Sequence, residues 1–357
     1  MSYDKKYVNF THIRNGCFGR VFKTQNMLTN EIVAVKKINI SLCQMQTKKT
    51  IYREICILCQ INSQYCIYLM DIYSEITNGK SLELCLVLPY MEYDLFHVIF
   101  SKEYNLRLYQ IIKIVYQLIM GLKYLYKCGI IHRDIKPSNI GINKNLDVKI
   151  LDFGLARDMK DDLTKYVVTR WYRPLEIFYT SSYTFAVDMW SVGCITVELF
   201  TKEPLFKSND GVDHVKRILS IMGFPDDHVL EGVSEEDVHG LNSFRNEAPN
   251  SCRLEKHIEK DVKRTLLSDE DATPDSFADI LKLIKQMLDL NPGTRITPML
   301  AQVSPIFLKH KCEIVKYSED PECSQFLCDE HLDNVDLEED LEKKIIKKIS
   351  DLNSKNE

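Results

Sequence analysis

The chain has 357 residues, of which 45% are hydrophobic and 27% are charged, and its formal net charge is −5. This length and hydrophobic content allow a large buried core and exclude a disordered protein. The small net charge and the lack of an apolar run of ~18 residues predict neither a nucleic-acid nor a membrane partner. We expect a protein of the cytoplasm, the nucleus or both.

The 12 cysteines are scattered through the apolar runs of a long chain, so we expect them to be reduced thiols. Cys56 and Cys59 form one CxxC pair. Because neither a second pair nor a nearby histidine stands at metal-ligand spacing, ordinary helix packing is preferred to a zinc or redox site.

Short alternating apolar runs in residues 7–88 predict β-strands, and one helix is expected over residues 47–60. Longer helical patterns follow from residue 95, and Gly129 is a stop signal for one of them. The sequence therefore predicts an α+β protein with an antiparallel β lobe (1–91), a larger helical lobe (92–310) and a C-terminal extension (311–357). Residues 207–274 are typical of a surface insertion with short helices, and the extension predicts an amphipathic helix.

Two motifs carry the strongest chemical signal. The run His132-Arg133-Asp134-Ile135-Lys136-Pro137-Ser138-Asn139 is followed by Asp152-Phe153-Gly154, and this order and spacing match the catalytic-loop and metal-binding signatures of protein kinases. Catalysis of phosphoryl transfer is mostly positioning and charge stabilisation. We expect Asp134 to accept the substrate hydroxyl proton, Lys136 to neutralise the transferring group, and Asn139 and Asp152 to bind Mg²⁺.

A lysine on a predicted strand completes this set. Lys36 shares a strand face with Ala34, whose small side chain leaves room for a flat adenine ring. Glu54 falls on the apolar stripe of the predicted helix, where a buried carboxylate is costly without a partner. These two observations predict an ion pair between Lys36 and Glu54.

The segment Ile13-Arg14-Asn15-Gly16-Cys17-Phe18-Gly19-Arg20-Val21 is expected to cover the nucleotide phosphates. It keeps Gly16, Gly19 and Val21 of the GxGxxGxV pattern but has Arg14 at the first glycine position. Both remaining glycines allow the backbone to approach phosphate closely. The effect of Arg14 on nucleotide exchange stays open.

Residues 10–307 resemble the protein kinase family, which implies a bilobal fold that uses ATP with Mg²⁺. The resemblance places Leu88 at the gatekeeper position and the backbones of Pro89 and Met91 against adenine, beside Ile13. Within the family, Thr169-Arg170-Trp171-Tyr172-Arg173 and Asp188-Met189-Trp190-Ser191-Val192-Gly193 resemble the branch of cyclin-dependent and mitogen-activated kinases. That branch implies Ser/Thr-Pro protein substrates and adds Thr169 to the catalytic set.

Thr164-Lys165-Tyr166 resembles the dual phosphorylation site of mitogen-activated protein kinases, with a loop of p38/Hog-like length. The resemblance implies an upstream dual-specificity kinase and opposing phosphatases. It also implies that Arg53, Arg133 and Arg157 would meet phospho-Thr164, and that Arg170 and Arg173 would meet phospho-Tyr166. Lys165 is unusual at the central position and leaves the subclass open. Glu319, Asp320 and Glu322 resemble an acidic docking patch, and a solvated acidic turn explains them equally well.

Two alternatives remain at this point. A cyclin-dependent-kinase-like enzyme is the nearest rival, although residues 50–54 lack the expected cyclin-binding sequence. A catalytically weak scaffold is the second, and it rests on Arg14 and on Pro174-Leu175-Glu176, which stands where Ala-Pro-Glu is usual. Glu176 is nevertheless available to pair with Arg295, and every catalytic and metal-binding side chain named above is present.

Overall fold

The structure is a computed structural model that describes residues 6–16, 19–77, 81–158, 170–180, 184–231, 233–249, 251–267, 269, 272–273, 275–310, 343 and 346–347. The chain divides into two compact units. Unit 1 contains the residues up to Glu92 together with Leu151–Leu155 and Ser324–Glu357, and unit 2 contains Tyr93–Ile150 and Ala156–Cys323. Each unit is described by itself.

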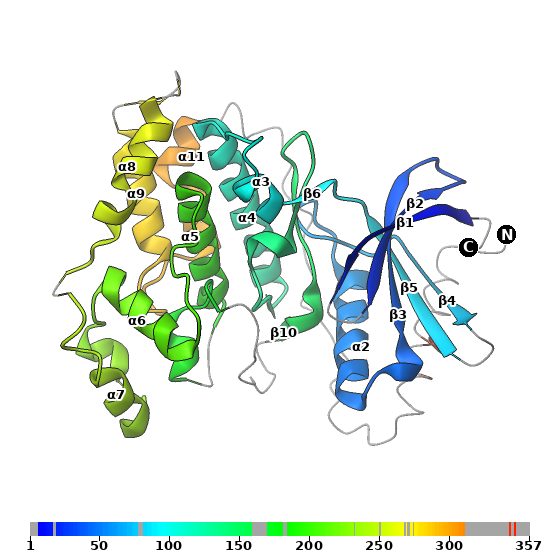
Figure 1. Cartoon of the computed structure of the whole chain (residues 1–357), viewed down its shortest axis with the longest axis horizontal. Helices are drawn as coiled ribbons and strands as arrows, with labels where there is room; N and C mark the ends of the chain where they lie inside the picture. The colour runs from blue at the N-terminus through cyan, green and yellow to red at the C-terminus, as the bar shows by residue number, and fades with distance from the viewer. Residues whose placement is uncertain are drawn as a thin grey trace. The chain divides into compact units, whose positions relative to one another are not determined.

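Unit 1 is built on a five-stranded antiparallel sheet with the strand order β1-β2-β3-β5-β4 (Figure 1). The strands are β1 (Tyr7–Asn15), β2 (Arg20–Asn26), β3 (Ile32–Asn39), β4 (Asp71–Thr77) and β5 (Ser81–Pro89). A 3₁₀ turn, η1 (Ile40–Leu42), leads from β3 into the helix α2 (Met45–Gln60), and a second turn, η3 (Phe153–Leu155), contacts α2. The helix begins two residues before its predicted start and ends where the pattern predicts.

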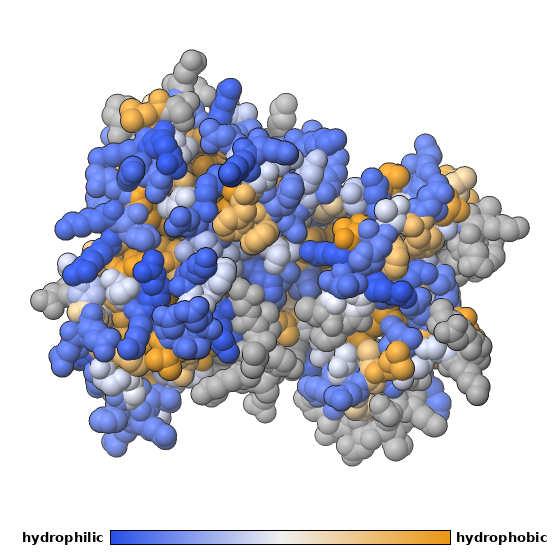
Figure 2. Space-filling view, viewed as in Figure 1, coloured by the Kyte–Doolittle hydropathy of each residue, from blue (hydrophilic) through white to orange (hydrophobic). Residues whose placement is uncertain are grey.

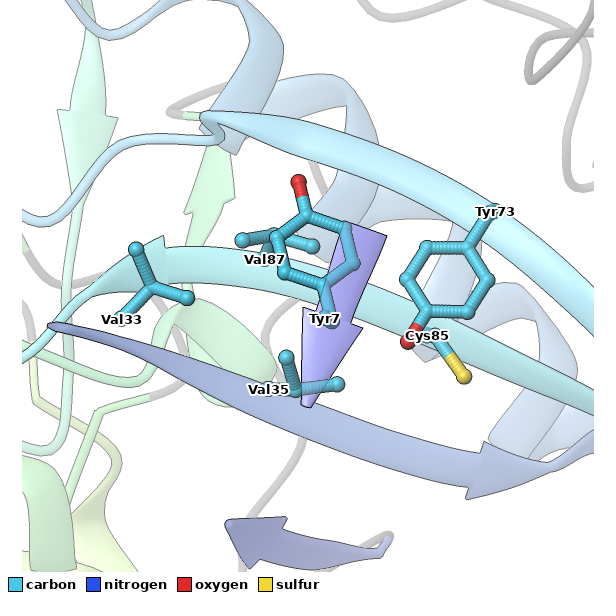
Figure 3. Packing of buried hydrophobic residues seen from close by; sticks show 6 residues of the cluster. All are labelled: Tyr7, Val33, Val35, Tyr73, Cys85 and Val87. Atoms are coloured by element: carbon cyan, nitrogen blue, oxygen red, sulfur yellow. The ribbon is translucent and has the colours of Figure 1, made fainter. Parts of the chain in front are cut away.

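One face of the sheet carries its own apolar cluster, which Figure 3 shows from close by. The rings of Tyr7 and Tyr73 stack with a centroid distance of 5.6 Å and lie against valines of β3 and β5. The cluster consists of Tyr7, Val33, Val35, Tyr73, Cys85 and Val87. Since side chains alternate along a strand, burial of Val33 and Val35 on this face turns Ala34 and Lys36 to the opposite face. The candidate site residues Ala34 and Lys36 therefore lie on the face of the sheet opposite to this cluster.

Unit 2 is mainly helical and contains two small sheets (Figure 1). Its helices are α3 (Leu95–Phe100), α4 (Leu108–Lys127), α5 (Ala186–Thr201), α6 (Gly211–Met222), α7 (Glu235–Asn242), α8 (Leu254–Leu267), α9 (Ser276–Met287), α10 (Pro298–Ala301) and α11 (Pro305–Lys309). Its strands are β6 (Tyr93–Asp94), β7 (Ile130–Ile131), β8 (Ile140–Ile142), β9 (Val148–Ile150) and β10 (Arg157–Asp158), and its 3₁₀ turns are η2 (Pro137–Asn139), η4 (Leu175–Phe178) and η5 (Asp227–Leu230).

Helix α5 forms the centre of unit 2. All of its residues from Val187 to Phe200 are buried, and α4, α8 and α9 pack against it (Figure 1). A helix that is apolar on all sides requires neighbours on all sides. Trp190 is fully buried and stacks on Phe206, and Gly193 allows Leu288 to approach the helix backbone. This rigid helix is the frame on which the functional segments of unit 2 are held.

The structure confirms the predicted α+β class, with an antiparallel sheet in the first part and helices in the larger second part. Helix α4 ends at Lys127, and Gly129 adopts the positive φ of 78° that favours glycine after a helix. Within residues 207–274, α8 buries Leu254, Ile258 and Val262 and packs on α5. That part of the expected surface insertion therefore belongs to the core.

The cysteines require one correction. Seven described cysteines are thiols outside any disulfide, including Cys56 and Cys59, which lie on α2 as expected for ordinary helix packing. Cys128 is disulfide-bonded, so the expectation of a reduced thiol is wrong there. Sequence spacing could not reveal this bond, since connectivity depends on which parts of the chain meet in space.

The surface seen in Figure 2 is mainly hydrophilic, with apolar side chains in small, separated areas. Among the described residues, none of the helices combines the length and the apolar character needed to cross a bilayer. In the same residues, His, Cys, Asp and Glu side chains nowhere gather in threes as a preformed metal cluster would require.

Candidate functional site

Each unit carries its own group of candidate functional residues. In unit 1, Lys36 Nζ lies 2.5 Å from Glu54 Oε1, so the ion pair that the sequence predicts is present. Glu54 lies on α2 and is 2% exposed, and Lys36 lies on β3 and is 7% exposed. Burial raises the pKa of Glu54, the ammonium group of Lys36 lowers it, and the Asp152 carboxylate raises it again. The lysine therefore compensates a carboxylate that would otherwise be costly to bury.

Strand register explains why the expected adenine-site residues share a face. Lys36 is paired with Val21 of β2 on one side and with Leu86 of β5 on the other, while Ala34 is paired with Leu88. Directly opposed residues of antiparallel strands point to the same face. Ala34 is 9% exposed, so the sheet offers a flat, apolar surface next to the Lys36 ammonium group.

The phosphate-covering segment connects β1 and β2. Gly16 N donates to Gly19 O at 2.7 Å, which closes a tight turn. A Cβ atom built on Gly19 would lie 2.2 Å from the main-chain oxygen of Lys37, so only glycine fits there. Arg14 is paired with Val21, and it therefore lies on the same face as Lys36. Ile13 is 44% exposed beside it.

The Asp152-Phe153-Gly154 motif belongs to unit 1. Asp152 has a positive φ of 61°, an unusual conformation for a non-glycine residue that marks a constrained site. Its Oδ1 accepts a hydrogen bond from Gly154 N at 3.2 Å, and Phe153 is 1% exposed in the turn that contacts α2. The packing of Phe153 fixes the carboxylate that precedes it.

In unit 2, three predicted residues of the catalytic loop converge. Lys136 Nζ and Asn139 Nδ2 each donate to Asp134 Oδ2 at 2.7 Å, and Asn139 Nδ2 also lies 3.0 Å from the Asp134 main-chain oxygen. The amide N–H groups of Asn139 donate in these bonds, so its Oδ1 is the atom that can act as an oxygen ligand. The predicted base, cation and metal ligand thus form one cluster.

Asp188, on the first turn of α5, binds the backbone of this loop. Its two oxygens accept hydrogen bonds from the backbone of His132 at 2.8 Å and of Arg133 at 2.9 Å. Arg133 has a positive φ of 69°, a conformation that needs such support. Burial raises the pKa of Asp188, and these bonds partly offset the rise. Asp188 lies within a motif that the sequence singled out, but no role was predicted for it.

The altered Pro174-Leu175-Glu176 sequence keeps its anchor. Arg295 Nη1 and Nη2 donate to the two Glu176 oxygens at 2.6 and 3.0 Å, and Arg295 also donates to the main-chain oxygens of Ala186 and Asp289. Leu175 is fully buried. A two-fork ion pair whose remaining donors are satisfied is the favourable form of a buried pair. The substitution therefore leaves this part of the fold intact.

The segment from Arg170 to Arg173 is tied to unit 2 at several points. Tyr172 Oη lies 3.0 and 2.9 Å from the two Glu198 oxygens, and Ser191 Oγ donates to Tyr172 O at 2.8 Å. Arg173 N donates to Arg170 O at 2.9 Å, so a turn brings these two arginines together. The role of Glu198 was not predicted. Its signal was available, since α5 is otherwise apolar and a carboxylate within such a helix needs a partner.

For several expected site residues the structure gives only the element in which they lie, and others lie outside the described residues. Arg53 lies on α2 in unit 1, and Arg157 lies on β10 in unit 2. Pro89 ends β5 and Met91 follows it, both of them half-buried. The phosphosites Thr164 and Tyr166, the catalytic Thr169, the acidic patch of Glu319, Asp320 and Glu322, and nearly all of the expected C-terminal amphipathic helix lie outside the described residues.

A lysine on the antiparallel sheet paired with a glutamate on α2, and a loop of Asp134, Lys136 and Asn139, are the side chains that phosphoryl transfer requires. The protein kinase domain family matches residues 7–307 of the chain. The chain is 37% identical over 293 residues to mitogen-activated protein kinase pmk-1 of Caenorhabditis elegans, covering 82% of this chain and 73% of that protein. It is 32% identical over 308 residues to human mitogen-activated protein kinase 13, covering 85% and 78%. It is 35% identical over 301 residues to mitogen-activated protein kinase HOG1B of Wallemia ichthyophaga, covering 84% and 76%.

The chain belongs to the protein kinase family and is a serine/threonine kinase of the mitogen-activated type. Its substrate ATP and its cofactor Mg²⁺ follow from the family. The prediction made from the motifs is confirmed at this level, and the cyclin-dependent alternative is not supported by these relatives.

Proposed function

We propose that the chain transfers the ATP γ-phosphate to Ser or Thr followed by Pro in other proteins, after phosphorylation of its own Thr164 and Tyr166. The observation that carries the catalytic part is the cluster in which Lys136 and Asn139 both bond to Asp134. Such a cluster, held rigidly by backbone contacts, supplies positioning and charge stabilisation, which dominate phosphoryl transfer.

Each residue has a role that fits its surroundings. Asp134 accepts the hydrogen bond of the attacking hydroxyl and orients it, and Lys136, 2.7 Å from that carboxylate, supplies positive charge for the transferring group. Thr169 completes the catalytic set by resemblance. Lys36, fixed by Glu54, contacts the nucleotide phosphates.

The residues also fit the nucleotide and the metal ion. Ala34, Val21 and Leu88 present small or apolar side chains on one face of the sheet, as adenine requires, with the backbones of Pro89 and Met91 at its edge. Asn139 and Asp152 offer hard oxygen ligands, the type that Mg²⁺ prefers. When bound, Mg²⁺ neutralises charge on the phosphate oxygens.

The proposed regulation depends on attraction between phosphate groups and arginine side chains. A phosphate on Thr164 or Tyr166 carries close to two negative charges at neutral pH and can bind several guanidinium groups. A turn closed by the hydrogen bond from Arg173 N to Arg170 O brings the backbones of two arginines together close to Thr164 and Tyr166 in sequence. Upstream dual-specificity kinases, phosphatases, docking through Glu319, Asp320 and Glu322, and a cytoplasmic or nuclear location stay predictions.

The experiment compares phosphate transfer from Mg-ATP to matched Ser-Pro and Ser-Ala peptides, with the chain unphosphorylated or phosphorylated at both Thr164 and Tyr166. We expect fast transfer only from the doubly phosphorylated chain and only to the Ser-Pro peptide. Asp134→Asn in the phosphorylated chain should lower the rate by at least about 10²-fold while ATP binding persists. Equal rates on both peptides would contradict proline direction.

The same experiment tests the scaffold alternative. A chain that binds Mg-ATP through Asp152 but transfers no phosphate in either form would act by holding partners. The Glu176–Arg295 pair weakens this alternative, because the altered Pro174-Leu175-Glu176 sequence keeps its structural anchor. Arg14 is then its remaining support.

A further inference from the structure

A buried histidine outside the catalytic cluster connects to the segment that carries Arg170 and Arg173. His214 lies in the first turn of α6 and is fully buried. Its Nε2 lies 3.0 Å from the main-chain oxygen of Arg173, and its Nδ1 lies 3.0 Å from Ser208 Oγ and 3.3 Å from Phe206 O. The proposed reaction gives this residue no role.

The hydrogen-bond partners of His214 indicate which ring nitrogen carries the proton. A main-chain oxygen only accepts, so Nε2 carries the proton and donates to Arg173 O. The Ser208 hydroxyl, 3.0 Å away, can donate, so Nδ1 of the neutral ring accepts from it, and Phe206 O at 3.3 Å is then a close contact and not a hydrogen bond. Burial has the largest effect and lowers the pKa of His214; the main-chain oxygens of Arg173 and Phe206 partly raise it, and the charges of Arg173 and Arg170 lower it. Both nitrogens of the neutral ring are therefore satisfied.

The histidine also belongs to a group of hydrogen bonds that attach residues 170–173, called here the arginine segment, to the residues just before α6. Trp171 Nε1 donates to Ser208 O at 2.7 Å, and the hydroxyl of the same Ser208 bonds to His214. Trp171 and Arg173 are thus both attached to the short stretch that leads into α6. The rings of Phe178 and Phe206 pack against the buried imidazole, so its hydrogen bonds are partly shielded from water. Such enclosed hydrogen bonds position a backbone more firmly than exposed ones.

We propose that His214 is a positioning residue for the phosphotyrosine switch: it holds the backbone at Arg173 so that the Arg170 and Arg173 guanidinium groups are placed to receive the phosphate on Tyr166. This inference rests on the proposed function. Removing the imidazole removes the hydrogen bond that holds the Arg173 main-chain oxygen against α6, so the segment would be held less firmly. The arginines would then bind the phosphate less tightly.

The test measures how much phospho-Tyr166 adds to the activity. The full chain is prepared with phosphothreonine at 164 and with either phosphotyrosine or tyrosine at 166, and kcat/KM for a Ser-Pro peptide is compared. We expect a ratio of at least about 10 in the wild type, a ratio close to one in His214→Leu, and a ratio within about threefold of wild type in His214→Gln, whose amide both donates and accepts.

Phe178→Leu is the matched control, because it loosens the packing around the imidazole without removing a hydrogen bond. It should lower the melting temperature and leave the ratio unchanged. If His214→Leu does not fold, Ser208→Ala replaces it, since that change removes only the donor to Nδ1 and should lower the ratio severalfold. A folded His214→Leu variant with the wild-type ratio would overturn the inference.

The result separates this inference from the proposed function. A wild-type ratio of one would mean that phospho-Tyr166 is not part of the switch, which refutes the proposed regulation itself. A large wild-type ratio that every His214 variant retains refutes only the positioning role. The ¹⁵N spectrum of the imidazole gives a second readout, and we expect the neutral Nε2-H form at pH 7. A protonated ring or the Nδ1-H form would contradict the assigned hydrogen bonds.

Discussion

Replacing Glu198 by Gln should remove a pH-dependent loss of stability. Glu198 is fully buried on α5, and its two oxygens share the single hydroxyl of Tyr172. Burial raises the pKa of this carboxyl from its ordinary value of 4.5 to about 7, although the Tyr172 hydrogen bond lowers it somewhat. A protonated carboxyl also suits the geometry, because one of its oxygens can then donate to Tyr172 Oη while the other accepts from the same hydroxyl.

The direction in which stability changes with pH follows from how many protons the folded and unfolded chains bind. Between pH 4.5 and 7 the folded chain keeps the proton on Glu198, whereas the unfolded chain releases it to water. Stability therefore falls as pH rises through this range, by about 3 kcal/mol for a shift of this size, and stays at the lower value above it. The glutamine that replaces Glu198 cannot ionise, and its amide can donate to Tyr172 Oη while accepting from the same hydroxyl.

Urea unfolding of the wild type and of Glu198→Gln at pH 4.5, 5.5, 6.5 and 8 gives the measurement. We expect the variant to gain about 3 kcal/mol relative to the wild type between the lowest and highest pH. Tyr172→Phe should move the loss to higher pH, because it removes the bond that lowers the Glu198 pKa. A stability difference that stays constant with pH would refute the reasoning.

Two further changes test other parts of the structure. Arg295→Met should destabilise unit 2 by about 3–5 kcal/mol, because it leaves Glu176 buried without its partner, and urea unfolding measures this loss. Adding Glu176→Gln to Arg295→Met should recover part of it, and an unchanged midpoint in the single variant would contradict the prediction. Gly19→Ala should weaken ATP binding at least about tenfold because its Cβ meets Lys37 O, whereas Gly16→Ala, whose Cβ meets its nearest atom at 3.4 Å, should be tolerated. Similar ATP affinities of the two variants, measured by calorimetry, would count against the turn geometry.

The site residues that sequence predicted well are those whose chemistry leaves few alternatives. Lys36 and Glu54 were paired by reasoning that a carboxylate on an apolar helix stripe needs a cation, and they lie 2.5 Å apart. Asp134 and Asn139 followed from motif spacing, and they meet in one loop. Local periodicity likewise predicted the class of the fold, since strands and helices have different repeats.

Other features depend on contacts that spacing does not encode. Whether α8 packs on α5 depends on how distant segments meet, and a polar composition concealed its apolar stripe of Leu254, Ile258 and Val262. The disulfide at Cys128 was missed for the same reason. His214 was missed because a lone histidine in an amphipathic helix is usually a packing residue, and only its three polar neighbours distinguish it.

The two carboxylates of α5 link the parts of unit 2 that must act together. Asp188, in the first turn, fixes the backbone of the catalytic loop, and Glu198, near the last turn, binds Tyr172 beside the arginine segment. At 1.5 Å per residue these anchors stand about 15 Å apart along one helix. Because the helix is buried on all sides, its packing holds both anchors in place. One helix of unit 2 therefore positions both the catalytic loop that holds Asp134 and the segment that carries Tyr172.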